Sequence, residues 1–246
     1  METSSPVLEI VLIFLVLALA SVIRTSAGFG FSLVSVPPLA LILDPVTAVT
    51  TAVIMAAPLS IWIAAKDWRH IDRRITLTAV LCAAAGVPIG IAVLTLLNER
   101  TLTIAIAAVV LACTALVWSK VKIRGGLPVI AGVSLFSGAS FASTGIDGPP
   151  MVAAMQGVGL EPRVQRATLA VVFSCTSLGS LVGFGTTGHL TMEVGKALLI
   201  GIPAFATGIV VGERLFKRFD ATRFRQVVLG LLIVSSVSIL TSVFST

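Results

Sequence analysis

Eight long apolar runs, each close to the length that crosses a lipid bilayer, dominate this sequence. An α-helix rises 1.5 Å per residue, so roughly 20 apolar residues cross a hydrocarbon core about 30 Å thick. The runs cover residues 7–23, 46–65, 75–97, 102–118, 127–142, 164–184, 192–212 and 227–244. They predict an all-α integral membrane protein that crosses the bilayer many times.

The scarcity of charged residues supports this fold class. Charged residues make up 11% of the chain, whereas soluble domains carry about 25%. The net charge of +6 is typical of basic loops on the cytoplasmic face of a membrane, so we expect no nucleic-acid partner. His70 and His189 have no neighbour at metal-ligand spacing, and we expect no metal and no cofactor.

Two shorter apolar pieces, residues 28–43 and 146–160, each follow a break rich in glycine and hydroxyl side chains. The basic residues decide whether these pieces cross the membrane. If both cross, the segments that carry Lys and Arg share one face, Arg24 among them, and only Arg100 and Lys196 lie on the other. The positive-inside rule favours this arrangement. It predicts about ten segments, eight full transmembrane helices and two short broken-helix segments, with both termini outside the cytoplasm.

The ten segments divide into two membrane repeats of five, residues 1–124 and 125–246, and an odd number per half makes the repeats inverted. Asp44-Pro45 matches Glu161-Pro162, 117 positions later. The same offset pairs three further positions: Gly28 with Gly145, Thr51 with Thr168, and Ser60 with Ser177. An offset of 122 positions pairs two GxxxG spacings, Gly86 and Gly90 with Gly208 and Gly212. Such spacings predict close helix packing, and inverted repeats with paired broken helices are typical of alternating access around a midplane site.

The breaks themselves are the candidate substrate site. Unwound backbone inside a bilayer is tolerated only where it lines a cavity or is buried in protein. A helix that begins at Pro149-Pro150 would direct free amides towards the second break, and such a terminus binds anions. We therefore expect a small anionic substrate. The candidate binding residues are Arg24, Thr25, Ser26, Gly28, Gly30, Thr51, Ser143, Thr144, Gly145, Asp147, Gly148 and Thr168.

Two charged residues beside the breaks leave alternatives open. Arg24 is either a counter-ion or gate for an anionic substrate, or an ordinary helix-end arginine that snorkels to the interface. Asp147 is either a proton-carrying carboxylate or the N-terminal cap of the helix that follows it.

The two breaks also carry a family resemblance. Gly28-Phe29-Gly30-Phe31, with Pro37-Pro38 and Asp44-Pro45 after it, resembles the first-repeat signature of the sulfite exporter TauE/SafE family. Gly148-Pro149-Pro150, followed by Glu161-Pro162 and Arg166-Ala167-Thr168, resembles the second-repeat signature of one subgroup. The resemblance extends over about residues 7–244.

This resemblance implies a secondary carrier, often export-directed, for small anions such as sulfite, sulfonates or other organosulfur compounds in a bacterial inner membrane. It carries a site role only to the matched positions Gly28, Gly30, Gly148, Pro149, Pro150 and Thr168. Two departures leave the substrate open. Phe31-Ser32 stands where the family often has glycines, and Asp147 stands where glycine is expected.

We therefore predict a secondary membrane transporter that exports a small anion by alternating access. An anion channel is the alternative. A membrane-embedded enzyme has less support, because no nucleophile–base set or metal cluster lies within a span, and we expect no enzymatic activity. The expected partners are the anion, the lipid bilayer and a coupling proton or cation. The oligomeric state stays open, a homo-oligomer included.

Overall fold

The computed structural model describes residues 6–27, 29–119 and 121–216, and all regular secondary structure in these ranges is helical. The elements are α1 (Pro6–Ala27), α2 (Phe31–Leu39), α3 (Pro45–Asp67), the 3₁₀ turn η1 (Trp68–His70), α4 (Arg73–Leu96), α5 (Glu99–Ser119), α6 (Leu127–Thr144), α7 (Gly148–Gly157), α8 (Pro162–Thr186) and α9 (Met192–Phe216). Within the described ranges, seven helices are long and apolar enough to cross a membrane. This confirms the predicted all-α integral membrane fold. The predicted span at residues 227–244 lies outside the described residues.

α4 shows how the helices divide their surface between lipid and protein. Leu77 and Leu81 are each 61% exposed, whereas Ala79 and Ala83 are almost completely buried. At these four positions the leucines point outwards and the alanines inwards, although Val87 and Leu94 of the same helix are also buried. This pattern suits a hydrocarbon solvent, in which helices associate through close packing of small residues.

The two short helices, α2 and α7, are each about half as long as the membrane is thick. α2 has 9 residues and α7 has 10, which give about 13 and 15 Å of helix. Full crossing of the hydrocarbon core needs about 30 Å. Each break therefore lies inside the bundle and not at its end.

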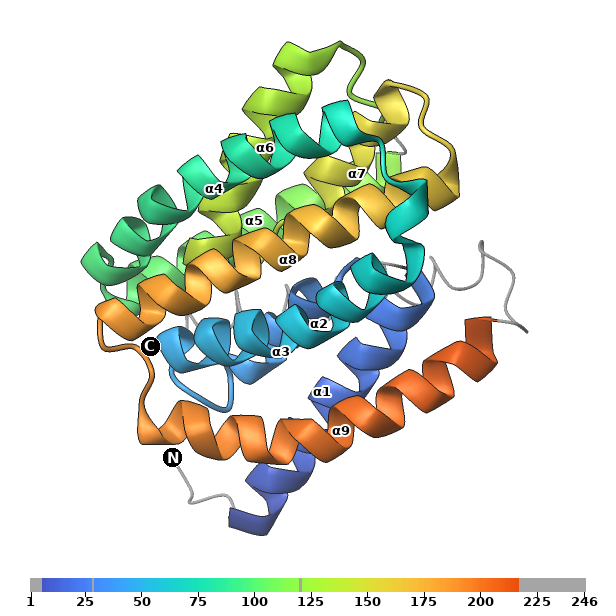
Figure 1. Ribbon diagram of the computed structural model, residues 1–246. Helices are drawn as coiled ribbons and strands as arrows, with labels where there is room; N and C mark the ends of the chain where they lie inside the picture. Colours follow the sequence, from blue (N-terminus) through green and yellow to red (C-terminus); the bar gives the residue numbers. More distant parts are fainter. Residues whose placement is uncertain (1–5, 28, 120, 217–246) are drawn as a thin grey trace.

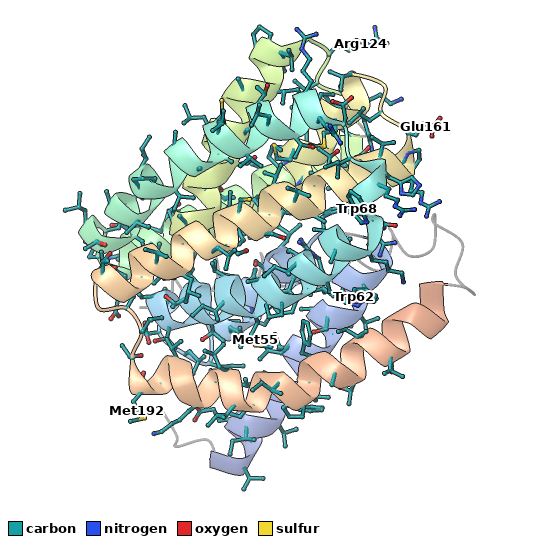
Figure 2. The ribbon with its side chains drawn as sticks, in the orientation of Figure 1. Met55, Trp62, Trp68, Arg124, Glu161 and Met192 are labelled. Atoms are coloured by element: carbon teal, nitrogen blue, oxygen red, sulfur yellow. The ribbon has the colours of Figure 1, made fainter. Side chains whose placement is uncertain are left out.

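The basic loops gather at one end of the bundle. Figure 2 shows Trp68, Arg124 and Glu161 near this end, with Met192 at the opposite end. Arg163 lies 3.8 Å from Asp67, so the segments after α3 and α7 meet here. A cavity of about 250 Å³ also opens here, between the starts of α4 and α6 and away from the breaks. This arrangement agrees with the charge distribution, and the side of the membrane to which this end belongs stays a prediction.

Three helix pairs make up most of the bundle. The most extensive contacts join α4 to α6 and α1 to α9, and α3 packs along α8. In Figure 1, α3 and α8 occupy the centre, with α4 and α6 above them and α1 and α9 below. Each of these pairs takes one helix from each predicted repeat, so the halves share a single interior.

Glycines bring the two outer pairs into close contact. A Cβ on Gly86 or Gly90 of α4 would overlap the carbonyl oxygen of Leu135 or Ala139 on α6. A Cβ on Gly208 of α9 would lie 2.7 Å from the Ala18 oxygen on α1. The packing role predicted for both GxxxG spacings is therefore confirmed.

The central helices α3 and α8 begin in the same way. Asp44 precedes α3, its Oδ1 accepts a hydrogen bond of 2.9 Å from the Thr47 N–H, and Pro45 occupies the first turn. Glu161 and Pro162 occupy the same positions at the start of α8. The Glu161 side chain, however, makes no capping hydrogen bond with the described residues.

This difference allows a paired test of stability. Asp44→Ala is expected to lower the free energy of unfolding by about 1 kcal/mol, because it leaves the Thr47 N–H without its cap. Glu161→Ala, the control, is expected to change it much less. Thermal unfolding of both variants in detergent measures the difference. Equal losses in the two variants would contradict the assigned cap.

Candidate functional site

The two breaks, far apart in sequence, lie against one another inside the bundle. A Cβ on Gly148, at the start of α7, would come within 3.0 Å of the Phe29 side chain just before α2. A Cβ on Gly145, at the end of α6, would lie 2.9 Å from Val36 of α2 and 3.8 Å from Val53 of α3. The side chain of Ser26 and the whole of Gly28 lie outside the described residues. The described parts of both breaks thus form one locus, as the prediction of a site at the repeat interface requires.

Two glycines with left-handed backbone allow these breaks. Gly30 has φ 92° immediately before α2, and Gly145 has φ 76° immediately after α6. A residue with a Cβ is strained in this region. The Gly145 N–H donates to the Phe141 oxygen at 2.8 Å, which closes the last turn of α6 before the chain turns away.

Arg24 lies in the last turn of α1 and is 3% exposed. Its Nη2 donates a hydrogen bond of 2.5 Å to the Ser60 Oγ on α3. Its guanidinium carbon lies 4.9 Å from the centre of the Phe173 ring on α8, within the range of a cation–π interaction. The interpretation of Arg24 as a helix-end arginine that snorkels to the interface is therefore wrong. Arg24 is a buried cation at the point where α1, α3 and α8 meet.

The Arg24 guanidinium is only partly satisfied. Its buried Nε has no hydrogen-bond acceptor among the described residues. A buried donor without a partner destabilises the protein, and a buried charge needs a counter-charge or further hydrogen bonds. An anion that approached this nitrogen would supply both a counter-charge and a hydrogen-bond acceptor.

Asp147 is the acidic member of the site and is 8% exposed. It occupies the N-cap position of α7, but in the described part of the chain its side chain makes no capping hydrogen bond. The interpretation of its carboxylate as a helix cap is therefore wrong. The charges of Asp147 and Arg166 both act on Arg24, and no direct ion pair joins Arg24 to Asp147 within the described ranges. Asp147 thus offsets only part of the charge of Arg24, and the guanidinium remains available to an anion.

The hydroxyl groups of the predicted site fall into two classes. Within the described residues, the buried hydroxyls of Thr25 and Thr51 have no hydrogen-bond partner. Ser143 and Thr144 instead donate to carbonyl oxygens of their own helix, at Ala139 and Ser140. The first two hydroxyls are free to donate to a ligand, whereas the second two are already engaged.

Thr168 has a different environment. Its Oγ1 accepts a hydrogen bond of 3.3 Å from the Asp72 N–H, so it ties α8 to the segment that precedes α4. The structure places this contact beside the basic loops, which are joined there by the Arg163–Asp67 pair.

Two residues that hold Arg24 were not among the predicted site residues. Ser60 had one signal, its match with Ser177 across the predicted repeats. Phe173 had none, because a phenylalanine in an apolar span is most often a packing residue. Over the described ranges no group of three or more His, Cys, Asp and Glu side chains is placed to hold a metal ion. The donors on hand are hydroxyls, amides and one buried guanidinium, and these bind oxyanions.

Comparison with known proteins adds one finding. The family model described as Sulfite exporter TauE/SafE matches residues 13–239. The match includes both breaks and every residue of the site described above. No curated protein and no solved structure matches the chain.

Proposed function

The chain belongs to the sulfite exporter TauE/SafE family, a family of membrane transporters, and we propose that it is a secondary carrier for a small oxyanion of the sulfite or sulfonate class. The observation that carries this proposal is the buried Arg24 guanidinium with its unsatisfied Nε, held by Ser60 and Phe173 beside the breaks. The family description favours export. A bacterial inner membrane is the proposed location.

Two related halves, residues 1–124 and 125–246, form part of the proposal. The glycine contacts support it, because they follow the sequence offsets. Gly86 contacts Leu135, and Gly208 contacts Ala18. Gly208 is 122 positions after Gly86, and Leu135 is 117 positions after Ala18. The next turn repeats the relation: Gly90 meets Ala139 and Ala142, and Gly212 meets Val22 and Thr25. Equivalent residues thus make equivalent contacts, as an internal two-fold axis requires.

Alternating access is the proposed mechanism, and an asymmetry between the halves supports it. Ala48 and Val49 in the first turns of α3 are completely buried. Their counterparts in α8, Gln165 and Arg166, are partly exposed. Two inverted repeats in one conformation of a carrier are expected to differ in this way, since the opposite conformation exchanges their environments. Under this proposal, the described structure corresponds to the conformation in which the start of α8 is accessible.

Coupling to protons is proposed at Asp147. An ionised Asp147 competes with a substrate anion for the positive field of Arg24 and Arg166, whereas a neutral Asp147 leaves that field to the anion. A proton and the anion would then cross together, so export would follow the outward gradient of the anion and would carry a proton out with it. The structure supports this proposal by placing the carboxylate near Arg24 without a direct ion pair in the described part of the chain.

Flux in proteoliposomes tests the function. Vesicles with purified protein are given labelled sulfite, thiosulfate, sulfoacetate, taurine or sulfate, with and without an imposed pH gradient. A carrier shows saturable uptake that unlabelled substrate on the opposite side accelerates. A channel shows no such acceleration, and absence of flux for every sulfur anion would refute the proposed substrate class.

Asp147→Asn is expected to abolish the stimulation of flux by the pH gradient and to retain exchange of anion for anion, because the amide neither binds nor releases a proton at these pH values. Glu161→Gln is the control, since Glu161 is exposed at the start of α8. Its gradient response is expected to equal that of the unmodified protein. Full stimulation in Asp147→Asn would remove Asp147 from the coupling mechanism.

A further inference from the structure

The hydroxyl of Ser177, in the middle of α8, is completely buried and has no hydrogen-bond partner among the described residues. Serine hydroxyls in helices commonly donate to the carbonyl four residues back, as Ser174 does to Ala170 at 2.7 Å. The Ser177 hydroxyl is one of eight buried hydroxyls without a partner in the described part of the chain, and a buried polar group without a partner calls for an explanation. One explanation is a partner that arrives in another conformation.

The repeat relation identifies this partner. Ser177 is the counterpart of Ser60, 117 positions later, and Ser60 accepts the hydrogen bond from Arg24. Both serines are 0% exposed. The sequence has no second arginine, because Phe141 stands at the position equivalent to Arg24. One buried arginine thus lies near two equivalent hydroxyl positions, and it donates a hydrogen bond to one of them, Ser60.

Arg24 already lies close to the second position. Its guanidinium stacks on Phe173, and Phe173 and Ser177 are four residues apart, so they lie on the same face of α8 in consecutive turns. Ala56 stands at the equivalent position in α3, and its oxygen accepts the hydrogen bond of Ser60 at 2.9 Å. Arg24 thus bridges the two central helices at their equivalent turns.

We propose that Ser177 is a second positioning residue for Arg24, which moves its hydrogen bond from Ser60 to Ser177 when the carrier changes to its opposite conformation. Phe141 stands at the position equivalent to Arg24, so an internal two-fold brings no second cation to Ser177. The exchange therefore needs Arg24 itself to turn from α3 towards α8, where it already stacks on Phe173. Arg24 would keep one hydroxyl partner in each state and present its remaining donors to the anion in both. This inference rests on the proposed alternating access.

The test measures the balance of the two conformations without substrate. Reporter cysteines are placed singly at Gln165 and Ala48, equivalent positions that are partly exposed and completely buried in the described conformation. The background lacks Cys82, Cys113 and Cys175. The rate of maleimide labelling at each reporter then gives the fraction of protein open at each end.

Ser60→Ala is expected to increase labelling at position 48 and decrease it at position 165. A hydrogen bond to a charged group changes the ratio of the conformations by about tenfold or more. Ser177→Ala is expected to shift the ratio the opposite way. Ser174→Ala is the control, since its hydroxyl is satisfied within α8, and it should leave the ratio unchanged. Ser60→Thr and Ser177→Thr keep the hydroxyl and should restore the original ratio, which also separates a loss of folding from a shift.

Equal labelling ratios in Ser60→Ala, Ser177→Ala and the unmodified protein would overturn the exchange, and so would shifts in the same direction. Flux measurements distinguish this failure from failure of the proposed function. Opposite shifts without any anion flux would uphold the exchange and refute the substrate class. Normal flux with no shift in either variant would uphold the substrate class and overturn the exchange.

Discussion

Arg24→Ala is expected to reduce anion flux by about a hundredfold or more. Removal of one partner from a buried charged contact costs about 2–5 kcal/mol, and each 1.4 kcal/mol changes an equilibrium about tenfold. Arg24 contacts both central helices, through Ser60 of α3 and Phe173 of α8. Its loss removes the positive charge that acts on Asp147, and an ionised Asp147 then repels an anion.

Two further variants sharpen this prediction. Arg24→Lys keeps the positive charge but loses the planar group that stacks on Phe173 and offers several donors, so partial recovery of flux is expected. Arg163→Ala removes a cation that is 66% exposed at the basic end and should change flux by less than about twofold, because exposed charges are screened by water and salt. Initial rates of labelled sulfite uptake, corrected for the amount of folded protein, measure all three. Flux in Arg24→Ala equal to that of Arg163→Ala would show that Arg24 has a structural role only.

Gly86→Ala and Gly90→Ala should each destabilise the protein by at least about 1–3 kcal/mol, the usual cost of overpacking. The added Cβ would overlap a backbone oxygen of α6, and a backbone moves less easily than the end of a side chain. α4 must then separate from α6, which loosens the most extensive helix contact in the described bundle.

Gly132→Ala provides the matched control on the opposite helix. Gly132 lies within α6, and a Cβ there would meet no described atom within 4 Å. Alanine favours a helix over glycine by about 1 kcal/mol, so this variant should be as stable as the original protein or slightly more so. Unfolding temperature in detergent, followed by circular dichroism, compares the three. Gly86→Ala with an unchanged unfolding temperature would contradict the close contact of α4 and α6.

The sequence predicted the positions of the membrane-spanning helices well, because the thickness of the bilayer sets how many apolar residues such a helix needs. The apolar run at residues 46–65 became α3 (Pro45–Asp67), and the run at 192–212 became most of α9 (Met192–Phe216). Both breaks also fell where glycine and hydroxyl residues cluster, because left-handed backbone at Gly30 and Gly145 needs glycine. These features depend on local sequence.

The surroundings of Arg24 could not be predicted in the same way. An arginine at the end of an apolar run usually reaches the membrane interface, and nothing near Arg24 in sequence indicates otherwise. Its burial depends on Ser60, 36 residues away, and on Phe173 in the other half. Asp147 was likewise ambiguous, because the sequence shows a cap position but not whether the side chain turns towards the helix.

The main helix pairs each join one helix from the first half of the chain to one from the second half, and this has a consequence for biosynthesis. α4 docks on α6, and α9 docks on α1, so the glycine-lined face of α4 has no partner until the second half of the chain leaves the ribosome. α2 can already contact α1 and α3, but α4 must wait in the bilayer for α6 and α8. Insertion and assembly are thus separated in time, and a ribosome that stalled midway would release a protein whose most closely packed surface was still open to lipid and to quality-control proteases.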